Sequence, residues 1–238
     1  MVEVLLLDNV SYIGQNNAIL KNLNLCAFEG EVHGVIGDYG ISHSELLKLL
    51  TLNLLFHSGH IYYYDKEVLP LSPSDSIKKG IFPLSSNCGL FSGLSIMDNI
   101  YLTARKYFGW HYNKEKVTTL AKQQLSMFDI HFSLNVPISE LSLLQKSAVY
   151  ITGAIISGAR LIVIDEITSS LGEQDSITFK RILTCLKFMG ITVICIVNKI
   201  DELVYFTDRA TLVKNGTTVR SITKDDYSYD KIITMLLI

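Results

Sequence analysis

The stretch GDYGISHSEL, at 37–46, has the residue types and spacing most suited to chemistry on a phosphate group. Phosphate-binding loops follow the pattern G-x-x-x-x-G-K-[ST], in which backbone N–H groups and a lysine hold phosphate oxygens and a hydroxyl holds Mg²⁺. The eight places of the pattern are filled here by Gly37, Asp38, Tyr39, Gly40, Ile41, Ser42, His43 and Ser44. The first glycine and the hydroxyl are kept, while serine replaces the second glycine and histidine replaces the lysine.

Each replacement weakens a phosphate site for a physical reason. A histidine is shorter than a lysine and is mostly uncharged at pH 7, so His43 lacks both the reach and the fixed charge of the ammonium. Ser42 carries a Cβ where glycine permits positive φ or close backbone approach. Ser44 keeps the oxygen that could ligate Mg²⁺. The loop pattern alone recurs by chance and needs a second motif to support it.

That second motif is LIVIDE at 161–166, a continuous apolar run that ends in two acids. Such a run is typical of a parallel strand buried on both faces. A carboxylate at the end of a strand beside a phosphate-binding loop can hold Mg²⁺ directly or through water. Asp165 and Glu166 are therefore candidate catalytic groups, and the alternative is that they only cap the end of a buried strand.

The elements that must position these residues alternate between strands and helices, which predicts an α/β fold. The expected strands are 4–10, 31–37, 59–68 as an edge strand, 161–166 and 191–197, followed by a hairpin over 208–222 that turns at Asn215-Gly216. The expected helices are 43–56 with Ser42 as its cap, a largely helical stretch over 97–158 broken at 135–142, 174–189, and a tail helix over 230–238. Residues 71–80 are expected to form a polar loop.

Composition excludes several function classes. The net charge of −2, the pI of about 6.3 and the lack of a basic run argue against nucleic acid as a partner. The four cysteines, Cys26, Cys88, Cys185 and Cys195, have neither zinc-site nor disulfide-framework spacing, which is typical of a reducing cytosol. The acidic start predicts a strand rather than a signal peptide, and no apolar run approaches the ~18 residues of a membrane span.

The chain is apolar for a soluble monomer, with a mean hydropathy of +0.30 and only 18% charged residues. One explanation is that part of its surface is covered by a partner chain or a membrane protein. The other is a heavily buried α/β sheet. The sequence leaves both open.

Four more segments, taken with the loop and LIVIDE, resemble the ATP-binding cassette of ABC transporters over nearly the whole chain. LSLLQ at 141–145 stands where the family has its LSGGQ signature, and DEITSSL at 165–171 resembles DEPTSAL. VNKIDEL at 197–203 lies where a strand ends in the family's switch histidine, and TDRATLVKNG at 207–216 resembles the family's closing DR…G segment. Within the family the chain looks most like the degenerate second cassette of monosaccharide-importer ATPases, which share Glu45 after the hydroxyl and a segment like GLSIMDNIYLTARKYF at 93–108.

The resemblance implies a P-loop NTPase fold of the ABC type: a mixed sheet core, a helical subdomain near 97–158 and an N-terminal antiparallel β portion, all in one domain over 1–238. It implies ATP and Mg²⁺ as cofactors, and the altered loop is expected to weaken the binding of both. Ser44 and Asp165 would hold the metal, and Glu166 would polarise the attacking water. The implied nucleotide contacts are the loop from Gly37 to Glu45 and Tyr12, which could stack on adenine or simply pack.

Several residues depart from the family pattern. The implied signature residues are Leu141, Ser142, Leu143, Leu144 and Gln145, and two leucines replace glycines that let a helix N-terminus approach the partner's phosphate. These leucines would crowd that approach or bury themselves against a partner. Asn198 stands at the switch histidine and cannot shuttle a proton near neutral pH. No glutamine occurs at 84–87, where the family has one, and Ser86 is the best substitute.

The sequence therefore predicts a degenerate cassette resembling sugar-importer ATPases, with weakened nucleotide binding and with hydrolysis lost or dependent on a competent partner cassette. The implied partners are a second cassette, identical or different, and membrane permease subunits. That assembly would place the chain in the cytoplasm at the inner face of the membrane. The alternative is a silent cassette reused as a regulatory or scaffolding module, and a third reading is an ordinary active ATPase.

Overall fold

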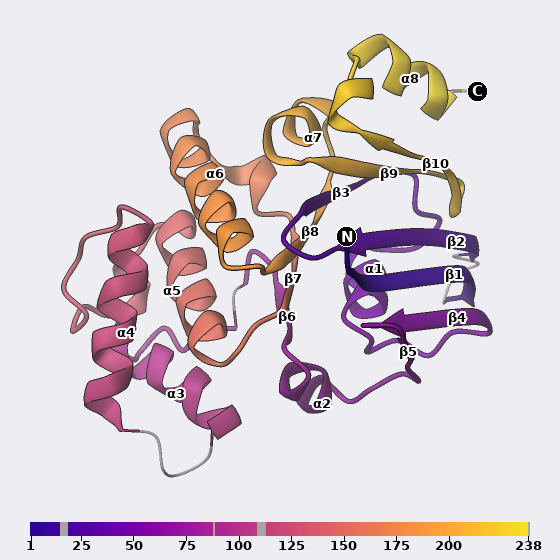
Figure 1. The fold of residues 1–238 in the computed structure, drawn as a ribbon. Coiled ribbons are helices and arrows are strands. Elements are labelled where there is room, and N and C mark those ends of the chain that lie inside the picture. The colour runs from indigo at the N-terminus through magenta and orange to yellow at the C-terminus, as the bar shows by residue number, and fades with distance from the viewer. Residues whose placement is uncertain (15–18, 88, 109–112, 238) are drawn as a thin grey trace.

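The computed structural model describes residues 1–14, 19–87, 89–108 and 113–237, and it contains two β-sheets with helices around them (Figure 1). The strands are β1 (Glu3–Ile13), β2 (Ile19–Phe28), β3 (Val32–Gly37), β4 (Ser58–Tyr63), β5 (Lys66–Glu67), β6 (Ile81–Leu84), β7 (Leu161–Asp165), β8 (Thr192–Val197), β9 (Arg209–Lys214) and β10 (Thr217–Thr223). The helices are α1 (His43–Leu50), α2 (Pro73–Lys78), α3 (Ile96–Phe108), α4 (Lys114–Met127), α5 (Leu143–Ile156), α6 (Glu173–Phe188), α7 (Ile200–Phe206) and α8 (Tyr229–Leu237). Cys88, residues 109–112 of the expected helical stretch and residue 238 of the expected tail helix lie outside the described residues.

The central sheet has six strands in the order β10-β9-β3-β8-β7-β6. Strands β9, β3, β8, β7 and β6 run parallel, and β10 returns antiparallel to β9 through the turn at Asn215-Gly216. Every residue of β7 and β8 is buried, as their continuous apolar sequences predict. The strands expected at 31–37, 161–166 and 191–197 and the hairpin are confirmed. Because β3, β8 and β7 are neighbours and parallel, their carboxyl ends meet at one edge of the sheet.

The second sheet is antiparallel and has the order β2-β1-β4-β5. The prediction of one edge strand over 59–68 was wrong. Tyr64 and Asp65 adopt positive φ, 49° and 58°, and turn the chain. Strand β4 therefore pairs with β1 inside the sheet, and of the segment 59–68 only the short β5 lies at an edge. The long strand β2, which was not predicted, pairs with β1 along its length.

Helix α1 lies between the two sheets (Figure 1). Its buried residues Leu46, Leu49 and Leu50 belong to a core cluster with residues of β1, β2, β3 and β7. The helix expected over 43–56 ends at Leu50 instead. Leu52 has a φ of 64° and cannot continue a right-handed helix, which explains the early end.

The prediction of a loop over 71–80 was also wrong, because α2 forms there. Ser72 caps it and Pro73 occupies the first turn, a combination that favours a helix start. Strand β6 extends the central sheet beside β7, and α7 follows β8. The sequence predicted neither element.

Helices α3, α4 and α5 pack on one another beside the central sheet and enclose a core cluster of their own (Figure 1). The break expected at 135–142 holds a short 3₁₀ turn, Ile138–Glu140, and the residues that lead into α5. Helix α5 also belongs to the main core cluster through Leu144, Ala148 and Ile151. It therefore connects the helical part to the sheet.

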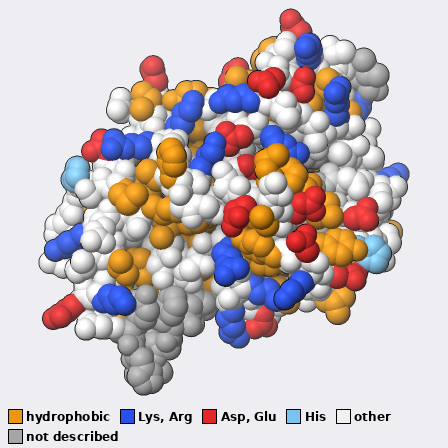
Figure 2. Space-filling view, in the orientation of Figure 1, with side chains coloured by type: hydrophobic (Ala, Val, Ile, Leu, Met, Phe, Trp, Pro, Cys, Tyr) orange, Lys and Arg blue, Asp and Glu red, His pale blue; other side chains and the backbone are white. Residues whose placement is uncertain are grey.

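The surface mixes charges of both signs with scattered apolar side chains, and the face in Figure 2 shows no large patch of one sign. Most large apolar side chains of the described residues belong to three core clusters. Exposed exceptions include Leu55, Leu69, Phe91 and Phe188. Within the described residues, none of the helices combines the length and apolar character that crossing a bilayer requires.

Candidate functional site

The candidate site lies at the carboxyl edge of the central sheet, where residues 38–42 connect β3 to α1. Gly37 and Gly40 have φ values of 130° and 68°. A Cβ on Gly37 would lie 1.9 Å from the carbonyl oxygen of Val213, and one on Gly40 would lie 2.2 Å from that of Ile19. Both positions therefore require glycine, which closes the loop tightly against β9 and β2. The Asp38 carboxylate accepts a hydrogen bond from the Gly40 N–H, at 3.0 Å, and fixes the turn.

A capping box starts α1. The Ser42 hydroxyl accepts from the Glu45 N–H at 3.3 Å, and the Glu45 carboxylate accepts from the Ser42 N–H at 3.0 Å. The Ser42 N–H and the Ser42 hydroxyl, which also donates to this carboxylate at 2.8 Å, lower the pKa of Glu45. The Tyr12 hydroxyl donates to the other carboxylate oxygen of Glu45 at 3.0 Å. Two residues expected at the nucleotide, Tyr12 and Glu45, are therefore brought together.

The cap leaves two backbone donors available at the helix start. Within the described part of the chain, the N–H groups of His43 and Ser44 have no hydrogen-bond acceptor, and the Ser44 side chain is exposed. Free N–H groups at a helix N-terminus, together with the helix dipole, favour an anion. This part of the loop retains the backbone chemistry of a phosphate site.

Two loop side chains point into the core instead of toward a ligand. Tyr39 is 4% exposed, and its hydroxyl donates to the carbonyl oxygens of Val35 and Val197 at 3.0 Å each. Burial raises its pKa well above the ordinary value. Ile41 is also buried. Tyr39 and Ile41 were expected near the nucleotide, and in this conformation only their backbone can reach one.

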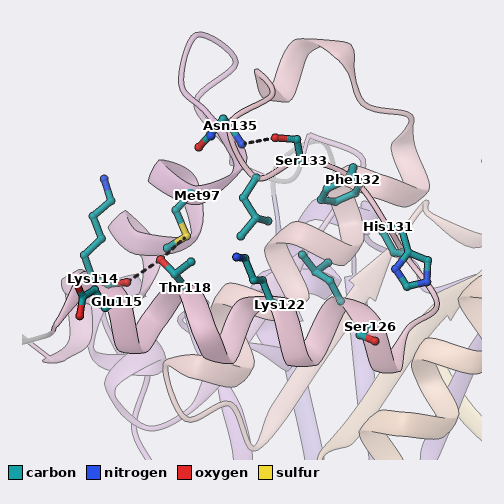
Figure 3. Close-up of a pocket in the computed structure, with 13 residues that line it drawn as sticks. Met97, Lys114, Glu115, Thr118, Lys122, Ser126, His131, Phe132, Ser133 and Asn135 are labelled. Carbon is teal, nitrogen blue, oxygen red and sulfur yellow. Dashed lines mark hydrogen bonds between the residues drawn. The ribbon is translucent and has the colours of Figure 1, made fainter.

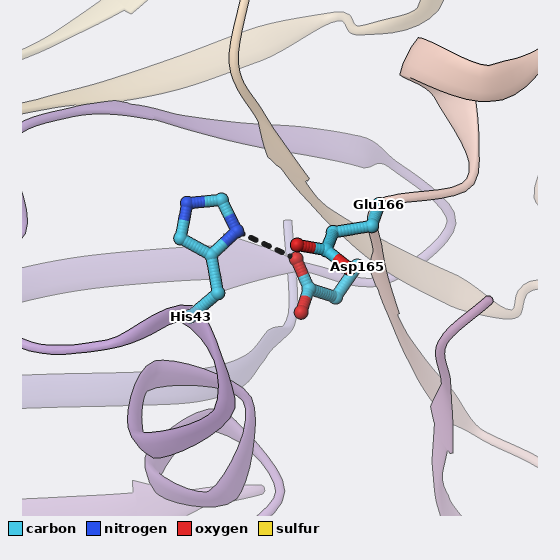
Figure 4. Close-up of side chains that lie close together, drawn as sticks. All are labelled: His43, Asp165 and Glu166. Carbon is cyan, nitrogen blue, oxygen red and sulfur yellow. Dashed lines mark hydrogen bonds and ion pairs between the residues drawn. The ribbon is translucent and has the colours of Figure 1, made fainter. Parts of the chain in front are cut away.

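The place of the missing lysine is occupied by an imidazole that pairs with a buried carboxylate. His43 Nδ1 lies 3.0 Å from Asp165 Oδ1, and the side chains are 27% and 7% exposed (Figure 4). Burial raises the pKa of Asp165, and the hydrogen bond from His43 opposes that rise. The tyrosine ring of Tyr39 stands edge-on to the imidazole, with centroids 5.3 Å apart. The ring of His43 is thus held toward the strand ends.

Glu166 completes the group at the end of β7. Its φ of 60° is uncommon for a residue with a side chain and breaks the alternation of a strand, so that two successive carboxylates can face one place. One ligand atom from each of His43, Asp165 and Glu166 lies within 4.8 Å of the other two (Figure 4). Strained backbone of this kind occurs often at functional sites.

The signature segment forms the start of α5. Ser142 is its N-cap, and Gln145 returns the hydrogen bond in a second capping box. Leu144 is 5% exposed and lies in the main core cluster of its own chain, and Leu143 is half-buried against that cluster. The expectation that both leucines crowd an approaching phosphate or bury themselves against a partner was wrong for Leu144, because its own core already covers it. Leu141 is also buried.

The remaining candidates lie at the same edge of the sheet. Asn198 is exposed directly after β8, and Ser86 is exposed in the turn after β6. Sequence reasoning missed Glu202, on α7, whose buried carboxylate accepts from the Thr168 hydroxyl at 2.7 Å. The pairing of His43 with Asp165 was missed as well. These contacts span 34 and 122 residues, and no local pattern signals either of them.

A second hollow lies on the helical part of the molecule. This groove of about 720 Å³ runs along α4 and the segment after it, and Figure 3 shows that its polar side chains are spread along both. Thr118 donates to the Met97 sulfur there at 3.3 Å. Among the described residues, the only close group of three potential metal ligands is the one at the loop. The loop is therefore the better candidate for chemistry.

Comparison with known proteins identifies the family of the chain. The family model described as ABC transporter matches residues 20–169. The ribose import ATP-binding protein RbsA of Bacillus licheniformis is 26% identical over 234 residues, which cover 97% of this chain and 47% of the relative. The chain spans about half the length of the curated relatives it matches.

Solved structures show the same fold. The ADP conformation of MJ1267, an ATP-binding cassette of an ABC transporter, superposes with a TM-score of 0.83 at 20% identity and covers 100% of this chain and 99% of that one. A dimeric post-hydrolysis state of the cassette MJ0796, bound to ADP and Pi, gives a TM-score of 0.76 at 23% identity, with 92% of this chain and 98% of that one covered. These identities show the fold alone. The fold and the family match together show that this chain belongs to the ABC transporter family and has the fold of its ATP-binding cassettes.

Proposed function

We propose that the chain is a degenerate nucleotide-binding cassette of a sugar-type ABC importer, in which ATP hydrolysis is lost or depends on a competent partner cassette. One observation carries this proposal. At the place of the phosphate-binding lysine stands His43, and its ring is paired with Asp165 at 3.0 Å. The relative named above is a ribose import protein, which supports the sugar class.

The charge balance at the loop supports weakened phosphate binding. Asp165 and Glu166 lie at the site, and within the described residues no lysine or arginine forms an ion pair with either of them. A phosphate that approaches the loop meets these carboxylates without the fixed cation that normally offsets them. The backbone N–H groups of His43 and Ser44 still attract it. Binding is therefore reduced rather than abolished.

The donors present still fit a magnesium nucleotide in part. The exposed Ser44 hydroxyl and the Asp165 carboxylate are the oxygen ligands that Mg²⁺ prefers. The ion would supply charge neutralisation of the phosphates when bound. Glu166 stands where a carboxylate could orient water, and the exposed Asn198 could only donate or accept hydrogen bonds. The residues of this chain would thus bind the magnesium nucleotide and orient water, but none of them replaces the positive charge of the lysine.

The altered signature segment at the start of α5 is the reason why we expect this chain to need a partner cassette. In the family each site joins one cassette's loop to the other's signature, so two copies of this chain would pair an altered loop with the Leu143-Leu144 segment. Phosphoryl transfer depends almost wholly on positioning and electrostatics. The loss of the lysine and of the signature glycines costs several kcal/mol of barrier, at about 1.4 kcal/mol per tenfold in rate. A complete cassette beside permease subunits at the membrane would supply what this chain lacks.

The test measures ATP hydrolysis by the purified chain, by its Glu166→Gln variant, and by each mixed with a complete cassette recovered with it from its native cells. We expect both proteins alone to give the same background rate. The wild-type mixture is expected to exceed the rate of the complete cassette alone. Hydrolysis by the isolated chain that Glu166→Gln abolishes would contradict the proposal, because it would show an intact site.

A silent regulatory or scaffolding cassette is the second candidate, and the buried Tyr39 favours it. Its ring is fixed by two hydrogen bonds beneath the loop, an arrangement that serves folding rather than ligand exchange. This function predicts that the mixture hydrolyses no faster than the complete cassette alone and that Glu166→Gln changes no cellular phenotype. A loss of transport in cells that carry Glu166→Gln would count against it.

A further inference from the structure

The group formed by His43, Asp165 and Glu166 has the composition of a transition-metal site. It offers one imidazole nitrogen and two carboxylates, contributed by the start of α1 and the end of β7 (Figure 4). The three potential ligand atoms all lie within 4.8 Å of one another. The two elements that supply them are separated by more than a hundred residues of sequence, so the packing of α1 on the sheet creates the group.

The distance within the group fits a shared cation. Zinc lies about 2.0–2.2 Å from nitrogen and carboxylate ligands, so two ligands at roughly 90–110° around it are about 3–3.5 Å apart. His43 Nδ1 and Asp165 Oδ1 are 3.0 Å apart. At the same distance the two atoms form a hydrogen bond when no ion is bound. Little rearrangement of these two side chains is needed to pass from one state to the other.

The local charge also favours a cation. Asp165 is buried, Glu166 follows it directly, and within the described ranges neither carboxylate has a lysine or arginine as an ion-pair partner. A buried carboxylate is stable when it is paired or bound to a metal. Glu166 is exposed, so water can reach the group and complete the coordination.

We propose that His43, Asp165 and Glu166 bind one divalent transition cation, with Zn²⁺ as the expected ion. An imidazole ligand favours Zn²⁺ over Mg²⁺, which prefers oxygen ligands only. The ion would return positive charge to the place where the lysine is missing. The inference concerns the same loop as the proposed function, yet it rests on the geometry of the nucleotide-free chain and does not require ATP binding.

The test is a calorimetric titration of the full chain, stripped of metal and free of nucleotide, with ZnCl₂ and separately with MgCl₂. The variants are His43→Gln, Glu166→Gln and the control His60→Gln. His60 is a suitable control because it lies on β4, in the antiparallel sheet, and forms an exposed pair with Glu67 at 2.6 Å. Circular dichroism and thermal melting confirm that each protein is folded.

We expect the wild type and His60→Gln to bind one Zn²⁺ with the same micromolar affinity. Affinity for Zn²⁺ is expected to fall at least tenfold in both His43→Gln and Glu166→Gln, and Mg²⁺ is expected to bind the wild type more weakly than Zn²⁺ does. Co²⁺ bound to the wild type should give a visible absorption band that His43→Gln loses. The inference is overturned if His43→Gln binds Zn²⁺ like the wild type, or if the wild type takes up none at 100-micromolar concentrations. Glu166→Gln decides the matter if His43→Gln does not fold.

This result is separable from that of the proposed function. Failure to bind Zn²⁺ removes the metal site and leaves the hydrolysis measurements unaffected. Conversely, if the isolated chain binds zinc and also hydrolyses ATP rapidly, the metal site would be supported and the proposal of a degenerate cassette would be contradicted.

Discussion

Two helices of this molecule, α1 and α5, start with the same capping chemistry but differ in the side chains that follow the N-cap. Ser42 caps α1 and Ser142 caps α5, and in each box the two hydrogen bonds measure 3.0 and 3.3 Å. After the cap, α1 presents His43 to Asp165, whereas α5 turns Leu144 into the core. The groups needed to start a helix are present at both places, while the groups that would hold a phosphate are altered at both.

The comparison separates folding from chemistry. Capping satisfies backbone groups that would otherwise lack partners, and it is needed whether or not the helix binds anything. A phosphate site needs in addition a cation and unobstructed backbone. The start of α1 keeps part of that requirement, because the N–H groups of His43 and Ser44 have no acceptor among the described residues. The start of α5 uses its side chains for packing instead.

The largest expected effect tests whether the α5 start is structural. Replacing Leu144 by alanine should destabilise the chain by about 3 kcal/mol, since it leaves a cavity in the main core. Replacing the half-buried Leu143 should cost clearly less. Urea unfolding of both variants measures the difference. A Leu144→Ala cost below about 1 kcal/mol would show that this leucine is available to a partner after all.

A second prediction concerns the strand that leads into the loop, β3. On β3, His33 is fully buried between Glu31, at 3.2 Å, and Thr211, at 2.8 Å. Burial lowers its pKa, opposed by the Glu31 carboxylate, with Arg209 also acting to lower it. The unfolded chain therefore takes up a proton below its ordinary pKa of about 6.5 while the folded chain does not.

Stability should consequently fall as the pH drops from 7.5 to 5.5, by at most about 1.4 kcal/mol for each pH unit below about 6.5. Urea unfolding at several pH values measures this slope. In the His33→Gln variant, which can still hydrogen-bond, the part of the slope due to His33 should disappear. An identical slope in the variant would show that other groups cause the pH dependence.

The smallest expected effect tests the similarity of the two caps. Ser42→Ala and Ser142→Ala should each cost about 1 kcal/mol of unfolding free energy, because each removes one acceptor from a helix start. Denaturation of the two variants under the same conditions gives the comparison. Costs that differ by more than about 1 kcal/mol would mean that one box does more than cap its helix.

The sequence predicted the site's two main segments because each has a strong local pattern. GDYGISHSEL combines glycines with a helix cap, and LIVIDE is a continuous apolar run with terminal acids. The order of strands then required them to meet at one edge of a parallel sheet. The family resemblance, carried by 141–145 and 165–171 as well, is confirmed by the family match.

What could not be predicted depends on contacts between distant residues. The pairing of His43 with Asp165 arises only when α1 packs between the sheets, and the burial of Tyr39 depends on carbonyl groups of β3 and β8. Strand β6 is short and contains Pro83, which argues against a strand from sequence alone. The early end of α1 follows from the backbone of Leu52, which no side-chain pattern indicates.

The measurement that tests the central claim most directly is a calorimetric titration of the wild type and the His43→Lys variant with Mg-ATP. His60→Lys serves as the control for an added lysine at an exposed histidine. A degenerate loop predicts weak binding by the wild type and by His60→Lys, and binding at least tenfold tighter, about 1.4 kcal/mol, by His43→Lys. Micromolar binding by the wild type that His43→Lys leaves unchanged would contradict the account, because it would show that this loop holds nucleotide without the lysine.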